Sequence, residues 1–179
     1  MDEILLIDQS IDTQAKRLDE LHLKLSFASI GEFMLSEDSI ALCEAPYNKP
    51  GLYYFELANL DGISEPNIWL ENFSPSWENR DFKWHSGLKK GRLKKHSSLK
   101  DWIPFYIGKS RFVGKRINEH ILQPAEKTTF SMKLKSTVKL HGNKFRVSWL
   151  PVEVKHYDII VPALERLMRD RFNPIVGKQ

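Results

Sequence analysis

Apolar side chains recur every three to four positions near the N-terminus of the chain. Between residues 10 and 26 they fall at Ile11, Ala15, Leu18, Leu21 and Leu25, while the charged residues fall largely elsewhere. This spacing predicts an amphipathic helix that packs either on the rest of the chain or on a partner. Residues 27–48 have a mixed pattern that predicts no particular element.

Three apolar or alternating runs further along the chain predict β-strands. They are GLYYFEL (51–57), IPFYIG (103–108) and KFRVSWLPVEV (144–154), and NIWLENF (67–73) predicts a further short strand. A helix is expected over about 111–122, capped by Ser110, and a last helix over about 160–172 with Pro162 in its first turn. Residues 74–100 have no clean period and indicate an irregular insertion.

The order of these elements is helix, strand, insertion, strand, helix, strand, helix. It predicts a small three-layered α/β (α+β) domain with a mixed or antiparallel sheet between helices. We divide the chain into an acidic N-terminal helical extension (1–48) and one domain (49–179) with an insertion at about 58–101.

Composition narrows the class of protein. The 179 residues are 41% hydrophobic and 11% aromatic, which suits one folded domain. Cys43 is the sole cysteine, so neither a disulfide framework nor a cysteine zinc site is expected. The acidic start is unlike a signal peptide, and no apolar run approaches the ~20 residues of a membrane span. We therefore expect a cytoplasmic protein that does not bind membranes.

Charge is divided unevenly along the chain. Residues 1–48 hold 3 Lys/Arg and 10 Asp/Glu, a net charge of −7. Residues 49–179 hold 24 Lys/Arg and 13 Asp/Glu, a net charge of +11. A basic domain suggests a polyanionic partner such as nucleic acid. The alternative is an ordinary solvated surface on which an acidic helix packs.

Five polar side chains form a candidate site. Tyr53 and Tyr106 lie near glycines on strands that could pair, Arg116 and His120 are four residues apart on one helix face, and Glu165 lies beside an apolar stripe. A phosphodiester hydrolase needs a proton acceptor, a cation for the charge on the phosphate, and a carboxylate for a divalent metal. Each residue alone also fits a common structural role: a core tyrosine, an exposed helix face or a solvated carboxylate.

The segments GLY (51–53) and YIG (106–108) resemble the signature of the GIY-YIG nucleases. In that family an arginine follows the second tyrosine by ten residues and a histidine by fourteen, which here are Arg116 and His120. The segment PALERLMRDRFNP, with Glu165, is similar to the family's metal-binding helix. KFRVSWL falls where the third strand of the family's three-stranded sheet is expected.

The resemblance implies a role for each residue. Tyr53 would be the general base or relay a proton, and Tyr106 would orient it or contact the phosphate. Arg116 would stabilise the transition state, and His120 would support the base or bind a phosphate oxygen. Glu165 would bind one Mg²⁺ or Mn²⁺ per site. From the residues themselves we add Lys109, which could contact a phosphate as a point charge.

The chain also departs from the family pattern. The insertion between the first two strands carries Trp84, His85 and basic residues that could bind DNA phosphates or merely be solvated: Lys89, Lys90, Arg92, Lys94 and Lys95. Gly177 stands where the family often has an asparagine, and either nearby Asn173 replaces it or that hydrogen bond is absent. No attached DNA-binding domain is recognisable, which favours the restriction-endonuclease branch.

These expectations define a leading hypothesis and an alternative. The leading hypothesis is a metal-dependent, site-specific, restriction-like endonuclease that hydrolyses double-stranded DNA, possible as a homodimer through the N-terminal helix. The alternative is a nucleic-acid-binding module that keeps this scaffold with weak or lost catalysis. A protein whose basic face binds an acidic protein is a third, weaker alternative.

Overall fold

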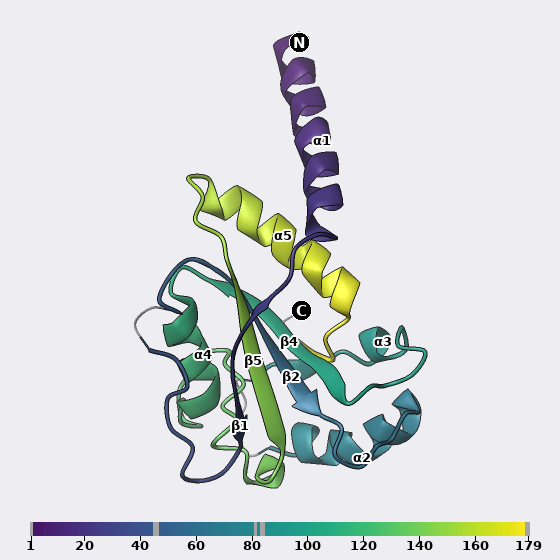
Figure 1. Cartoon of the computed structure of the whole chain (residues 1–179), viewed down its shortest axis with the longest axis vertical. Coiled ribbons are helices and arrows are strands. Elements are labelled where there is room, and N and C mark those ends of the chain that lie inside the picture. The colour runs from purple at the N-terminus through teal and green to yellow at the C-terminus, as the bar shows by residue number, and fades with distance from the viewer. Residues whose placement is uncertain (1, 45–46, 81, 83–84, 178–179) are drawn as a thin grey trace.

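The computed structural model describes residues 2–44, 47–80, 82 and 85–177 (Figure 1). The main elements are α1 (Asp2–His22), β1 (Ala28–Met34), β2 (Gly51–Ala58), α2 (Pro66–Glu78), β4 (Trp102–Ser110), α4 (Val113–Leu122), β5 (Lys144–Pro151) and α5 (Tyr157–Phe172). Shorter elements are β3 (Gly87–Leu88), α3 (Lys90–Leu93), a 3₁₀ turn at Val138–Leu140 and β6 (Val176–Gly177).

The central sheet has the strand order β1-β5-β2-β4, and every neighbouring pair is antiparallel. The expected α/β class with an antiparallel sheet is thus confirmed. The predicted strands correspond to β2, β4 and β5, and β1 adds a fourth at the edge beside β5. Because β1 lies at residues 28–34, the description of residues 1–48 as a helical extension holds for α1 but not for this strand.

One predicted strand was wrong: residues 67–73 lie inside helix α2. Pro66 occupies the first helical turn, and the Glu65 carboxylate accepts a hydrogen bond from the backbone N–H of Asn67 at 3.4 Å. Trp69, Phe73 and Trp77 follow at intervals of four and are buried. The period of the aromatic residues is therefore helical, and it overrides the strand propensity of the short run.

Two helix starts also differ from the sequence expectation. Helix α5 begins at Tyr157, so Pro162 lies in its second turn and not its first. Phe112, rather than Ser110, occupies the N-cap of α4. The Ser110 hydroxyl nevertheless accepts a hydrogen bond from the Phe112 N–H at 3.0 Å, so it orders the turn that leads into the helix.

Side chains alternate between two faces of the sheet, and each face has its own core. On the first, which we call the α4 face, Phe55, Phe105 and Phe145 pack with residues of α4. On the second, the α5 face, Leu52, Tyr54 and Ile107 pack with Val161, Leu164 and Met168 of α5. The sheet is therefore covered by helices on both sides, as a three-layered domain requires.

The insertion between β2 and β4 folds onto the same body. Trp77 of α2 is fully buried, and its indole N–H donates to the Ser86 carbonyl at 2.9 Å. Strand β3 pairs with β6, which joins the insertion to the C-terminal segment. In the part of the chain that the structure describes, no helix has the length and apolar character needed to cross a membrane.

Candidate active site

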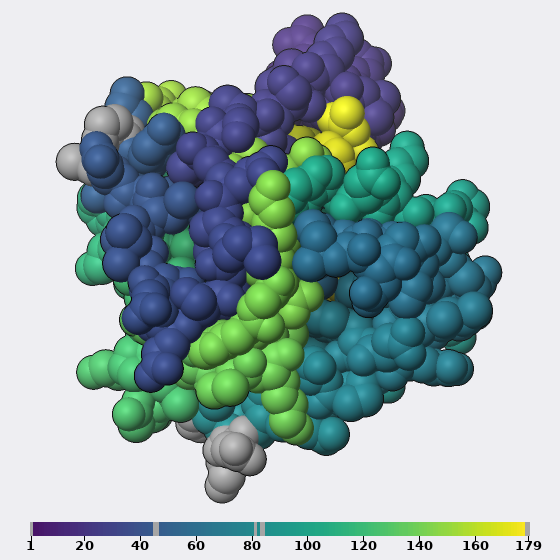
Figure 2. Space-filling view, turned by 60° about the horizontal axis from the view of Figure 1, so that its bottom comes forward, coloured from purple at the N-terminus to yellow at the C-terminus, as the bar shows by residue number. Residues whose placement is uncertain are grey.

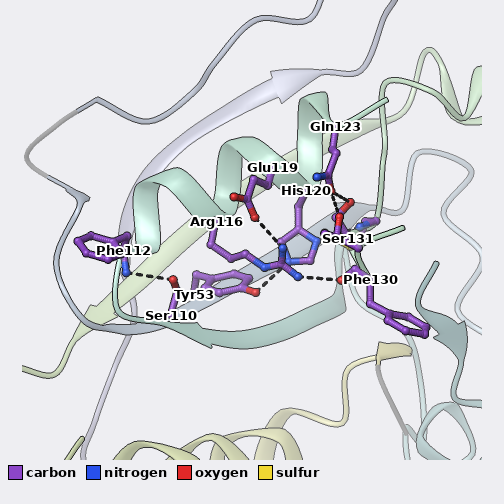
Figure 3. A network of polar contacts seen from close by, with 11 residues as sticks. Tyr53, Ser110, Phe112, Arg116, Glu119, His120, Gln123, Phe130 and Ser131 are labelled. Carbon is purple, nitrogen blue, oxygen red and sulfur yellow. Dashed lines mark hydrogen bonds and ion pairs between the residues drawn. The ribbon is translucent and has the colours of Figure 1, made fainter. Parts of the chain in front are cut away.

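The site is centred on Tyr53, which projects from β2 toward α4. Its ring is 1% exposed, and its hydroxyl oxygen lies 2.8 Å from Nε2 of His120 on α4 (Figure 3). The other ring nitrogen of His120, Nδ1, accepts the backbone N–H of Met132 at 2.9 Å. Nδ1 must therefore be unprotonated, so the neutral imidazole carries its hydrogen on Nε2 and donates it to Tyr53.

Burial sets the protonation states of this pair. Burial lowers the pKa of His120 well below its usual value, and the positive charge of Arg116 lowers it further, so the imidazole is neutral at pH 7. Burial raises the pKa of Tyr53 well above 10, and Tyr106 adds to the rise while Arg116 opposes it. Tyr53 is thus a phenol at rest, and both the His120 N–H and the Arg116 charge favour its ionised form.

Tyr106 and Gly108 on β4 complete the aromatic part of the site. The rings of Tyr53 and Tyr106 are stacked, with centroids 6.0 Å apart and an interplanar angle of 20°. Gly108 is paired with Tyr53 across the two strands. A Cβ atom at Gly108 would lie 2.3 Å from the Tyr53 hydroxyl oxygen and 2.8 Å from the Tyr106 ring, so no larger residue fits without displacing a phenol.

Arg116 lies one helical turn before His120 and is held at two points. One guanidinium nitrogen donates to the Glu119 carboxylate at 2.7 Å, and another donates to the Phe130 carbonyl at 2.8 Å (Figure 3). The side chain remains 24% exposed. Our sequence analysis did not single out Glu119, although its position three residues after Arg116 is a helical contact distance that could have indicated it.

The insertion supports this site through Arg80. Its guanidinium lies 3.8 Å from the ring centroid of Trp77 and donates to the Met132 carbonyl at 3.0 Å. Burial lowers the pKa of Arg80 to about 9, which still leaves it charged at neutral pH. Arg80 thus holds the residue whose N–H fixes the His120 tautomer. No spacing in the sequence connects residues 80 and 132, so only the fold reveals this contact.

Glu165 approaches from the α5 face. One carboxylate oxygen accepts from the Lys109 ammonium at 2.5 Å, and the other lies 3.8 Å from a guanidinium nitrogen of Arg169. Burial raises the pKa of Tyr106, Arg116 opposes this rise, and the charge of Glu165 adds to it. Glu165 therefore lies within electrostatic reach of Tyr106, while Tyr53, Tyr106, Arg116 and His120 form one group on the α4 face.

The donor chemistry of Glu165 fits a hard divalent ion. A carboxylate oxygen is the ligand that Mg²⁺ and Mn²⁺ prefer, and Mg²⁺ commonly binds through one or two carboxylates with several waters. Among the described residues no group of three or more His, Cys, Asp or Glu could hold a metal, so such an ion would rely on Glu165 and water. Lys109 is the ion-pair partner of this carboxylate, and its contact with a phosphate stays a prediction.

The basic residues of the insertion lie in two settings. Lys90 is 3.4 Å from Glu78, an ion pair within the insertion, and Arg92 donates to Asp170 at 2.9 Å, which attaches the insertion to α5. Lys94 and Lys95 are exposed, and Lys89 is half-buried near Gly177. His85 is half-buried with Nδ1 3.1 Å from the Ser86 carbonyl, and Trp84 lies outside the described residues.

Asn173 and Gly177, the two positions near the C-terminus at which the sequence was compared with the family pattern, each have a structural role. Asn173 ends α5 in the left-handed conformation at φ 48°, and its N–H donates to the Arg169 carbonyl at 3.0 Å, so its backbone caps the helix. At Gly177 an added Cβ would lie 3.2 Å from a guanidinium nitrogen of Arg169. Arg169, which our sequence analysis missed, thus lies beside both Glu165 and Gly177.

No family model, no curated protein and no solved structure matches this chain. The geometry of the described residues is consequently what any functional proposal must be argued from.

Proposed function

We propose that this chain is a metal-dependent DNA endonuclease of the GIY-YIG type that hydrolyses phosphodiester bonds. One observation carries the proposal: the Tyr53 hydroxyl lies 2.8 Å from a neutral His120 inside a cluster that also contains Tyr106 and Arg116. A buried base held by a fixed donor, beside a cation, is the arrangement that hydrolysis of a phosphodiester requires.

The proton acceptor in this proposal is Tyr53. Tyr53 first releases its own proton to solvent, a step that the positive charge of Arg116 favours. The phenolate then takes a proton from the attacking water, and the His120 N–H stabilises the phenolate by a hydrogen bond. Because Met132 blocks Nδ1, His120 acts as a donor and not as a second base. The departing 3′-oxygen takes a proton from solvent, which gives 3′-hydroxyl and 5′-phosphate ends.

The cationic groups act on the phosphate. Arg116 donates to the oxygens on which charge grows in the transition state, and its contacts with Glu119 and Phe130 hold the guanidinium in place before substrate binds. Glu165 would hold the metal ion. A bound Mg²⁺ or Mn²⁺ supplies Lewis-acid polarisation of a phosphate oxygen.

The basic domain supports DNA as the substrate. A net charge of +11 over residues 49–179 favours a polyanion, and the exposed Lys94 and Lys95 are available for backbone phosphates. We propose restriction-like cleavage at a specific site, because the insertion adds recognition surface directly to the domain that carries the site.

Plasmid nicking with Mg²⁺ or Mn²⁺ tests the proposal. We expect the wild type to convert supercoiled plasmid to nicked and linear forms, and Arg116→Ala and Glu165→Gln each to lower the rate by roughly 10²–10³-fold, because each removes stabilisation of the transition state. Lys115→Ala is the matched control, since Lys115 is an exposed cation one residue before Arg116.

Two outcomes would contradict the proposal. Nicking by both site variants at the wild-type rate would indicate a contaminating nuclease. Salt-sensitive DNA binding without metal-dependent nicking would favour the second candidate function, a nucleic-acid-binding module on the same scaffold. The observation that favours this module is the pairing of Glu165 with both Lys109 and Arg169, two cations that compete with any metal.

A further inference from the structure

Helix α1 projects from the domain, and among the described residues its contacts with the domain lie near the helix C-terminus. Figure 1 shows its first turns extending beyond α5, and Figure 2 shows the same projection from another side. Large apolar side chains are exposed along the projecting part, among them Ile4 at 73%, Ile7 at 59% and Ile11 at 62%. Most of a helix's stability in a protein comes from packing of its amphipathic face, so this exposed apolar face indicates a partner.

The apolar positions of α1 follow a heptad pattern. Ile4, Ile11 and Leu18 are spaced by seven, and Ile7, Gln14 and Leu21 form the alternate set three residues later. Apolar residues at these two sets of positions form the narrow stripe by which two helices pack in a coiled coil. The stripe predicts that another helix, rather than a flat surface, covers this face.

The C-terminal part of the stripe is already covered by the chain itself. Leu18 and Leu25 pack against the apolar cluster of the α5 face. Arg171 donates to the His22 carbonyl at 2.8 Å, which fixes the end of α1 to α5. The free stripe therefore runs from Ile4 to Gln14, and a partner helix must fit beside this segment without reaching Leu18.

Charges along α1 select the partner and its direction. Residues 2–12 hold four acids and no base, whereas residues 13–24 hold three bases and two acids. Two copies in parallel would place Glu3 of each next to Asp8 of the other, and their α5 helices would meet at Leu18. Two copies that run antiparallel, centred near residue 9, place Glu3 of each beside Arg17 of the other, with one close Asp8–Asp8 approach.

We propose that α1 is a homodimerisation helix, which packs antiparallel on α1 of a second copy through Ile4, Ile7, Ile11 and Gln14. Ile7 of each copy faces Ile11 of the other in this arrangement. The free stripe covers only about two heptads, so the dimer is expected to be reversible, with a dissociation constant of roughly 1–100 μM. The inference does not depend on nuclease activity.

Sedimentation equilibrium of the full chain from about 1 to 300 μM tests the interface. We expect the mass to rise from one copy to two, and the double variant Ile7→Asp with Ile11→Asp to remain monomeric throughout. Leu6→Asp is the matched control, because Leu6 is 64% exposed but lies off the stripe. The dissociation constant of this variant's dimer should be within about threefold of the wild-type value. Far-UV circular dichroism checks that each variant is folded.

A charge exchange tests the direction of the pairing. Glu3→Lys should weaken the antiparallel dimer about threefold or more by opposing Arg17, and adding Arg17→Glu to the same chain should restore it. In a parallel dimer Glu3→Lys would instead strengthen binding by attracting Asp8. A wild type that stays monomeric up to 300 μM, or equal loss of dimer in the Leu6→Asp control, would overturn the interface itself.

Discussion

The two faces of the central sheet carry different chemistry. On the α4 face, polar groups are buried among aromatic rings: the Tyr53 hydroxyl and the His120 imidazole contact each other at full burial. On the α5 face, the cluster beneath α5 is apolar, and charged residues lie around it: Lys109, Glu165 and Arg169 at one edge, and the buried Glu56, paired with Arg146, beside Tyr54. The proposed base and the proposed metal ligand thus belong to opposite faces.

Strand β4 connects the two faces at adjacent residues. Gly108 faces the Tyr53 hydroxyl, and Lys109, which alternates to the other side, contacts Glu165. A phosphate that contacted both groups would therefore have to lie at this end of β4. The α4 face thus fixes geometry and protonation, whereas the edge of the α5 face carries ion pairs that include the partly exposed Lys109.

Among the substitutions that compare the two faces, the largest effect is expected from filling the space at Gly108. Gly108→Ala would place a Cβ atom 2.3 Å from the Tyr53 oxygen, so the phenol must move away from His120. Misplacing a catalytic group by about 1 Å can lower a reaction rate about 10²-fold, and we expect a loss of that order here. Plasmid nicking measures the rate, and urea unfolding should show a loss of about 1–3 kcal/mol from overpacking.

Gly91→Ala is the matched control for this prediction. Gly91 lies in the short helix α3, and a Cβ atom there would meet no atom within 4 Å. This variant should keep the wild-type rate and be at least as stable as the wild type, because alanine favours a helix more than glycine does. Full activity of Gly108→Ala would mean that the contact between Tyr53 and His120 is not needed for catalysis. The α4 face would then not be the part of the site that depends on exact geometry.

The second expected difference between the faces is a loss of stability in acid that comes from His120 on the α4 face. Burial lowers the pKa of His120, so below pH 6.5 the unfolded chain binds a proton that the folded chain does not. The free energy of unfolding should therefore fall as the pH drops below about 6.5. His120 alone contributes up to about 1.4 kcal/mol per pH unit to this fall, and it contributes no pH dependence above about pH 6.5.

His120→Gln measures this contribution. Glutamine can accept from the Met132 N–H and donate to Tyr53 but does not titrate, so the variant should lose stability less steeply between pH 6.5 and pH 5 in urea unfolding. His156→Gln, which changes an exposed histidine, is the matched control. Identical slopes for wild type and His120→Gln would show that His120 is protonated in the folded protein.

The sequence predicted β2, β4 and β5 because each is an apolar or alternating run, and it predicted α1 because apolar residues recur at helical spacing over residues 11–25. It also predicted that Tyr53, Tyr106, Arg116, His120 and Glu165 would converge. The structure brings the first four together on the α4 face, whereas Glu165 lies on the α5 side, paired with Lys109. Helix α2 was mistaken for a strand because a seven-residue window is too short to distinguish two apolar periods. Strand β1 gave no signal, since an edge strand exposes most of its side chains.

Contacts between distant segments could not be predicted from local pattern. The Met132 N–H that orients His120 is a backbone group, which every residue except proline possesses, so no residue type marks it. Arg80 reaches Met132 only because α2 carries it across the domain. The ion pair of Lys109 with Glu165 joins residues 56 positions apart, and it becomes visible only when the alternation of β4 is combined with the position of α5.

The smallest expected effect concerns the edge of the α5 face. Lys109→Met keeps most of the aliphatic stem but removes the cation that contacts the Glu165 carboxylate at 2.5 Å. Because a metal ion and Lys109 would compete for the same oxygen, we expect Mn²⁺ to bind Lys109→Met several-fold more tightly than the wild type in isothermal titration calorimetry. The free energy of unfolding should change by less than about 1 kcal/mol, since Lys109 is partly exposed.

Lys115→Met is the control, because it removes an exposed cation on α4 without touching Glu165. Activity then separates two roles for Lys109. If the ammonium only occupies the carboxylate, tighter Mn²⁺ binding should accompany an unchanged or higher nicking rate at low metal concentration. If it moves to a phosphate when DNA binds, nicking should fall although Mn²⁺ binds more tightly. Unchanged Mn²⁺ affinity would mean that Glu165 is not the metal ligand, and the α5 face would then have no part in the proposed chemistry.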